Sequence, residues 1–150
     1  MNTATRQVIG PLNQRGFTLI ELMIVVVVVS ILAAIAYPSY TRYVENTRQA
    51  EAQGAMMELA GALERYRAKN FSYNGAAGQL GDLSPSLAGS KYYTVAIAVQ
   101  GGNDQQYVIS ATPKAGLMAD SEFLALNSEG QTCMKKSSCT IGTDPSWKDD

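Results

Sequence analysis

RGFTLIELMIVVVVVSILAAIAYP, residues 15–38, is the stretch that decides the fold of this chain. Between residues 17 and 36 its only ionisable side chain is Glu21. As a helix, residues 17–37 would rise about 32 Å, which matches a membrane hydrocarbon core of about 30 Å. We therefore predict a membrane-spanning helix, with Arg6 and Arg15 preceding it on the cytoplasmic side.

Three interpretations of this segment differ in what happens at its N-terminal end. An ordinary signal peptide would be cut near Ala36, but its apolar core would be longer than the usual 7–15 residues and would contain a carboxylate. A plain single-pass anchor would leave Glu21 reaching toward the membrane interface. The third interpretation is based on the order of the residues. A polar leader ends in Gly16, and Phe17 begins the apolar run one helical turn before Glu21. We favour the third.

Residues 16–38, GFTLIELMIVVVVVSILAAIAYP, closely resemble the N-terminus of type IV pilins, the class III prepilin signal. The resemblance covers the processing site, the acid and the proline. It implies that a prepilin peptidase cuts between Gly16 and Phe17, so that residues 1–16 are a leader peptide. It also implies that the new α-amine of Phe17 is methylated while residues 17–38 stay on the mature protein as the membrane and filament-core helix.

The single acid in the span has a matching cation in such a protein. A charged side chain is costly in lipid, and the α-amine of Phe17 is positively charged with or without a methyl group. The amine of the same helix can compensate Glu21 in part. In a bundle of helices the amine of a neighbouring subunit can pair with it instead, although desolvation offsets part of the gain. We therefore expect Glu21 to set the register between subunits.

Two further positions bear on the shape of this helix. Pro38 would remove one helical hydrogen bond and crowd the carbonyl of Ala34, so we expect a kink inside a continuing helix. The alternative is that the helix ends near Tyr37. Ser30 departs from the family, since pilins of this class usually carry a glycine there, at a position associated with local melting of the helix in filaments.

The chain beyond residue 38 predicts a second helical segment followed by a loop. Residues 39–70 repeat apolar side chains every three or four positions, which indicates the amphipathic half of the same long helix. Residues 71–90 are rich in Gly, Ser and Asn and predict a connecting loop. The stripe expected to pack on a sheet consists of Met56, Leu59, Leu63 and Tyr66.

Three segments within residues 91–150 alternate in the period of two that is typical of strands, and the turn residues GGND separate the first two. Short connections favour antiparallel neighbours. We therefore predict an α+β protein, in which a long N-terminal spine helix packs on a small antiparallel sheet, as in the type IV pilin fold. The three segments are KYYTVAIAV at 91–99, QYVISAT at 106–112 and FLALNSEGQ at 123–131.

Composition excludes several classes of function. The 150 residues carry a net charge of −1 and contain no histidine, which excludes histidine-dependent catalytic triads and histidine metal ligands. We expect no enzymatic activity and no cofactor. Cys133 and Cys139 are too few for a cysteine-only zinc site and predict one disulfide in an oxidising compartment. Pilins usually close a longer segment with their disulfide, so this short spacing is a departure from the family.

The C-terminal region offers a weak signal for nucleic acid. Lys135 and Lys136 are the only adjacent basic pair, and Trp147 is the only tryptophan. We expect the two lysines to be solvated rather than bound to DNA, and Trp147 to cover an edge of the sheet.

Within the family, the chain is most similar to minor pilins of the PilE type, through YYTVAIAV, SATPKAG and FLALNSEG. This resemblance implies a structural subunit that helps to prime or assemble a bacterial type IV pilus used for twitching, adhesion or DNA uptake. Implied partners are other pilins, the prepilin peptidase and methyltransferase, and an inner-membrane assembly platform. The subunit would cross the inner membrane once, with a cytoplasmic N-terminus, and become extracellular in the pilus. The alternatives are a major pilin, a type II secretion pseudopilin and a secreted domain with an ordinary signal peptide.

Overall fold

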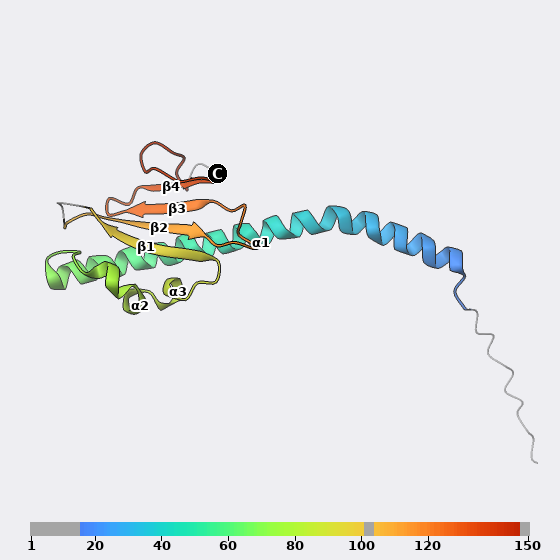
Figure 1. Ribbon diagram of the computed structural model, residues 1–150, viewed down its shortest axis with the longest axis horizontal. Helices are drawn as coiled ribbons and strands as arrows, with labels where there is room; N and C mark the ends of the chain where they lie inside the picture. Colours follow the sequence, from blue (N-terminus) through green and yellow to red (C-terminus); the bar gives the residue numbers. More distant parts are fainter. Residues whose placement is uncertain (1–15, 101–103, 148–150) are drawn as a thin grey trace, which may run out of the picture. The chain divides into compact units, whose positions relative to one another are not determined.

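The computed structural model describes residues 16–100 and 104–147 of the chain. Two compact parts meet at Pro38 and Ser39, and each is described by itself below. The elements, shown in Figure 1, are α1 (Leu19–Asn70), η1 (Ala76–Gln79), α2 (Leu80–Leu83), α3 (Pro85–Ala88), β1 (Tyr93–Val99), β2 (Tyr107–Pro113), β3 (Phe123–Asn127) and β4 (Thr132–Lys135).

The first part consists of the apolar N-terminal portion of α1. By length and composition, this helix could cross a membrane, and no residue of its most apolar window is buried within the chain. Pro38 lies inside α1, which contradicts the alternative that the helix ends near Tyr37. A kink at Pro38 remains a prediction. The helix also continues through Ser30. The hydroxyl of Ser30 donates to the carbonyl oxygen of Val26 at 2.7 Å, so this polar group has a hydrogen-bond partner within the apolar helix.

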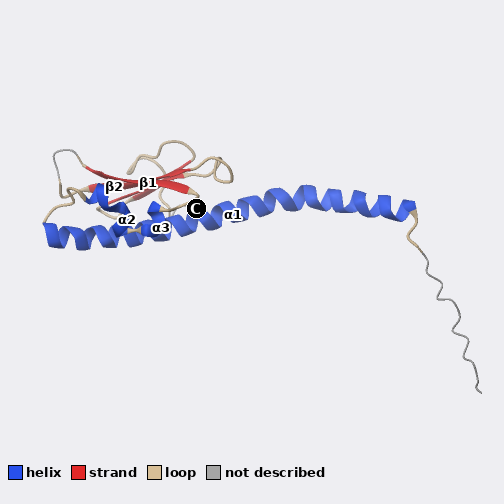
Figure 2. Ribbon diagram, turned by 60° about the horizontal axis from the view of Figure 1, so that its bottom comes forward, coloured by secondary structure: helices blue, strands red, loops and turns tan. Residues whose placement is uncertain are grey.

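The second part is a four-stranded antiparallel sheet lying along the C-terminal half of α1 (Figure 2). The strands follow one another in the order β1-β2-β3-β4, so the sheet is a meander built from consecutive hairpins. Ile97 of β1 stands opposite Ile109 of β2, which in turn stands opposite Leu126 of β3. This register brings the apolar residues of the three predicted strands onto one face, as their alternation required.

The core forms where this face meets α1. Met56, Leu59 and Leu63 of the predicted stripe are fully buried, which confirms that the stripe packs on the sheet. Tyr66 lies at the margin of the core and donates its hydroxyl to the carbonyl oxygen of Asn74 at 2.9 Å. The buried strand residues that meet the helix are Tyr93, Ile97, Tyr107, Ile109, Ala111, Leu124, Leu126 and Met134.

Two segments differ from the predicted organisation. Residues 71–90, expected to be a connecting loop, contain η1, α2 and α3, and they bury Tyr73, Ala76 and Leu87 in the core. Each of these helices has only four residues, too short for a helical period to show in the sequence. The strand β4 was not predicted either; it pairs with β3. The predicted leader, up to residue 15, and most of the GGND turn lie outside the described residues.

Phe71, directly after α1, has a backbone conformation that favours glycine. Its φ is 59°, and a side chain in this left-handed region strains the backbone by about 1 kcal/mol. The ring gains little in return, since the residue is 83% exposed. We expect Phe71→Gly to raise the free energy of unfolding by about 1 kcal/mol, measured by urea unfolding of the purified subunit in detergent. Phe71→Ala keeps a Cβ and is the control; a glycine variant no more stable than the alanine variant would contradict the strain.

Candidate functional site

The N-terminal end of α1 is the first candidate site, and Thr18 and Glu21 form it. The backbone N–H of Thr18 donates to Oε2 of Glu21 at 3.0 Å, and the hydroxyl of Thr18 donates to the same oxygen at 2.8 Å. In return, the backbone N–H of Glu21 donates to the hydroxyl oxygen of Thr18 at 3.3 Å. This is a capping box, in which the residue before the helix and the third helical residue satisfy each other's groups.

Gly16 and Phe17 lie directly before this capping box. Together with Thr18 and Glu21 they bound an open hollow at the start of the helix. Phe17 is 89% exposed, and a Cβ added at Gly16 would meet no atom of the described residues within 4 Å. The predicted cleavage bond therefore lies in uncovered backbone, next to the predicted register acid.

Sequence reasoning missed Thr18 as a functional residue. The signal was present, because Thr18 and Glu21 have the T-x-x-E spacing of a capping box before an apolar run. Of the other predicted site residues, Pro38 lies within α1, whereas Cys133 and Cys139 belong to the second part of the chain.

A disulfide joins Cys133 and Cys139, as predicted, with their Cα atoms 6.0 Å apart. Around it, the backbone N–H of Met134 donates to the carbonyl oxygen of Pro145 at 2.9 Å. The indole N–H of Trp147 donates to the carbonyl oxygen of Cys133 at 2.9 Å. Trp147 thus contacts β4, the edge strand, as the sequence predicted. These contacts fold the C-terminal segment back along the edge of the sheet.

The lysine pair inside this loop is not simply solvated. Lys135 donates to Oδ1 of Asp144 at 2.8 Å, while the backbone N–H of Thr140 donates to Oδ2 of the same carboxylate at 2.8 Å. The hydrogen bond from Lys135, and next that from Thr140, lower the pKa of Asp144 below its ordinary value. Lys136 is exposed and has no ion pair among the described residues. The loop therefore presents one unpaired cation rather than two.

Removing the disulfide tests how much it stabilises the folded subunit. We expect the free energy of unfolding of the Cys133→Ala, Cys139→Ala double variant to be about 2 kcal/mol lower than that of the wild type. The reason is that the disulfide no longer restricts the unfolded chain by closing the short loop. Urea unfolding with and without a reductant measures this. The reductant should destabilise the wild type and leave the variant unchanged; equal sensitivity of both proteins would contradict the assignment.

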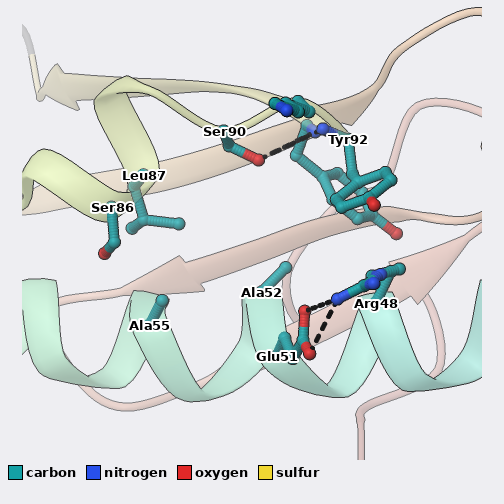
Figure 3. A pocket seen from close by; sticks show the side chains of 10 residues that line it. Arg48, Glu51, Ala52, Ala55, Ser86, Leu87, Ser90 and Tyr92 are labelled. Carbon is teal, nitrogen blue, oxygen red and sulfur yellow. Dashed lines mark hydrogen bonds and ion pairs between the residues drawn. The ribbon is translucent and has the colours of Figure 1, made fainter.

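A groove of about 250 Å³ in the second part of the chain is the other candidate site (Figure 3). Its walls come from α1, α3 and the segment that enters β1. Nη1 of Arg48 donates to both carboxylate oxygens of Glu51, at 2.9 and 2.8 Å, and the guanidinium lies 4.7 Å from the ring centre of Tyr92. These interactions, led by the hydrogen bond to Glu51, raise the pKa of Arg48. The arginine thereby joins α1 to the start of the sheet.

The groove is lined by charged as well as polar side chains. Its lining includes the paired Arg48 and Glu51, Lys91, two serines and two tyrosines, and burial raises the pKa of one of these, Tyr93, to about 12. Burial similarly raises the pKa of Tyr107 to about 12. Both phenols therefore stay protonated at neutral pH, and the hydroxyl of Tyr93 donates to the carbonyl oxygen of Glu122 at 3.3 Å. Among the described residues, no three carboxylates or cysteines gather where they could hold a metal ion.

Each of the two parts of the chain matches a known protein family or motif. The family described as "Type IV minor pilin ComP, DNA uptake sequence receptor" matches residues 38–135. The "Prokaryotic N-terminal methylation motif" matches residues 11–37, which include the capping box and the predicted cleavage bond. No solved structure matches the chain.

Relatives include fimbrial, type IV pilin and type II secretion proteins. The chain is 34% identical to the fimbrial protein EcpC of Eikenella corrodens over 87% of its length and 78% of that protein. It is 29% identical to the type IV major pilin PilA of Myxococcus xanthus, over 91% of its length and 56% of that protein. The type II secretion system core protein G of Pseudomonas aeruginosa is 42% identical over 41% of this chain and 43% of its own. From its methylation motif, its helix-on-sheet fold and these relatives, the chain belongs to the type IV pilin family and is a structural subunit.

Proposed function

We propose that the protein is a minor pilin, present in few copies in a type IV pilus and needed for its priming or assembly. The observation that carries this is the minor-pilin family match, which covers most of the globular part, residues 38–135. Before assembly the subunit resides in the inner membrane with its N-terminus in the cytoplasm, and it is then extracted into the filament by an assembly platform. Assembly exchanges lipid contacts for helix contacts, so burial of apolar surface alone gives little drive within the membrane.

Processing creates the group that assembly needs. In this proposal a prepilin peptidase cuts between Gly16 and Phe17 and the new amine of Phe17 is methylated. The uncovered backbone at Gly16 and the methylation motif over residues 11–37 support this step. The Glu21 carboxylate of one subunit then pairs with the Phe17 amine of a neighbour, which selects the axial step between subunits because a shifted neighbour would leave both charges unpaired in an apolar bundle.

Copy number distinguishes a minor pilin from a major pilin, which is the alternative raised by the Myxococcus xanthus relative. Sheared filaments are purified and each pilin is counted by mass spectrometry against isotope-labelled peptides. A minor pilin is expected in the filament fraction in far fewer copies than the most abundant subunit. Finding this chain to be the most abundant subunit would contradict the minor role, and its presence only in secretion-system filaments would favour a pseudopilin.

A second candidate function, DNA binding during uptake, is favoured by the match to a family described as a DNA uptake sequence receptor. The charges give it limited support, because the chain as a whole is slightly acidic and Lys135 is paired with Asp144. Fluorescence anisotropy with labelled duplex DNA tests it on the full chain in detergent. A DNA receptor would show an affinity that falls steeply with salt and drops in a Lys136→Gln variant. No binding at low salt would exclude this candidate.

A further inference from the structure

We propose that Thr18 is a positioning residue for the contact between subunits. In this inference, Thr18 holds one oxygen of the Glu21 carboxylate against its own helix and leaves the other oxygen for the amine of the neighbouring subunit. The inference rests on the pairing of Glu21 with the neighbour's Phe17 amine proposed above. It adds a device within each subunit that fixes the acid before the neighbour arrives.

The geometry of the capping box separates the two carboxylate oxygens. Oε2 of Glu21 accepts both hydrogen bonds from Thr18, at 3.0 Å from the backbone N–H and 2.8 Å from the hydroxyl. In the part of the chain that the structure describes, Oε1 accepts no hydrogen bond. A carboxylate has about four acceptor positions, so an ion pair at Oε1 does not displace Thr18.

Processing would not disturb this arrangement. Every donor and acceptor of the capping box belongs to Thr18 or Glu21, and both residues follow the proposed cleavage bond between Gly16 and Phe17. The amine that cleavage would create belongs to Phe17 and is not one of the groups in the box. Mature subunits in the membrane therefore keep the carboxylate held by Thr18, with the new amine beside it.

A fixed carboxylate favours pairing for two physical reasons. A glutamate side chain has many rotamers, and ordering them during assembly opposes binding. Thr18 has already selected one rotamer, so less order has to be imposed when the neighbour docks. The two hydrogen bonds also stabilise the charged form of the acid in an apolar environment, where an unsatisfied carboxylate would favour protonation. Both effects keep the acid ready as an anion at a defined height on the helix.

The test compares three substitutions at threonines of the same helix. Thr18→Val removes the hydroxyl but keeps the shape and the backbone donor, while Thr18→Ser restores a hydroxyl. Thr47→Val is the matched control, since the hydroxyl of Thr47 donates to the carbonyl oxygen of Tyr43 in its own helix, at 2.8 Å. Copies in sheared filaments are divided by the mature, methylated pool in the membrane, so that an effect on processing does not enter the result.

We expect Thr18→Val to enter filaments about fivefold less often than wild type, the effect of losing the hydrogen bond from the Thr18 hydroxyl to the Glu21 carboxylate. Thr18→Ser and Thr47→Val should match wild type. A helix cap with no link to Glu21 would give the same loss, so Thr18→Val is also made in a Glu21→Ala background. There it should cause no further decrease, because a residue that acts through Glu21 has nothing left to position. Isotope-labelled peptides make a further loss measurable at that low level.

Two outcomes would overturn the inference while leaving the proposed function intact. One is normal incorporation of Thr18→Val. The other is an equal fivefold loss with and without Glu21, which would make Thr18 a helix cap and nothing more. Absence of the wild-type chain from every filament fraction would instead overturn the proposed function, and the inference with it.

Discussion

Glu21→Ala is expected to be cleaved and methylated normally and yet to enter filaments at least about 30-fold less often than the wild type. Truncating one member of a desolvated charge pair leaves the other charge buried and unpaired, which costs more than the pair itself contributed. In the proposed filament the group left behind would be the amine of a neighbour's Phe17. Quantitative mass spectrometry of sheared filaments, normalised to the mature membrane pool, measures the loss.

Two variants show whether charge is the cause. Glu21→Gln has the same size and is neutral, so it should fail nearly as severely as the alanine variant. Glu58→Ala removes an exposed carboxylate from the C-terminal half of α1 and should assemble normally. Normal incorporation of either Glu21 variant would contradict the register role assigned to this acid.

Gly16→Leu should reduce the yield of mature protein on the order of 100-fold. A peptidase that cuts beside glycine can approach the backbone closely, and a branched side chain there would displace the scissile carbonyl by enough to cost that factor. The fold of the described residues does not oppose the change, because a Cβ at Gly16 meets none of their atoms within 4 Å. A loss of processing would therefore reflect the peptidase and not an altered subunit.

The readout is the mass of the membrane-bound chain, which distinguishes a retained leader from a free, methylated Phe17. Gly16→Ala adds only a methyl group and should be processed at an intermediate rate. Recovery of mature Gly16→Leu protein in normal yield would show that the chain is cut elsewhere. A mature N-terminus near Tyr37 would support an ordinary signal peptide.

Regular periodicity made most of the fold predictable. The long apolar run identified the first part of α1, and the spacing of Met56, Leu59 and Leu63 identified the face that packs on the sheet. Alternation in three segments gave β1, β2 and β3 with the correct faces inward. With only two cysteines in the chain, the disulfide had one possible pairing.

The features that escaped prediction depend on contacts rather than on local pattern. The strand β4, TCMK, is too short to show an alternation, and the disulfide, Trp147 and Pro145 all bond to its residues. The four-residue helices in residues 71–90 leave no periodic signal in the sequence. Thr18 was readable from its spacing to Glu21, but the sequence reasoning offered only α-amines as partners for this acid and not the threonine that caps the same helix.

Pairing between subunits involves two chains, and assembly as proposed here depends on it. The most direct test is the distance between the Glu21 carboxylate of one subunit and the Phe17 amine of the next in an assembled filament that contains the protein. Solid-state NMR with labelled methylamine nitrogen and labelled glutamate carboxyl carbon, or a cryo-EM map of the filament, would provide it. We predict an ion-pair separation of about 4 Å or less between nitrogen and oxygen. A separation beyond about 8 Å, roughly one Debye length at physiological salt, would contradict the account.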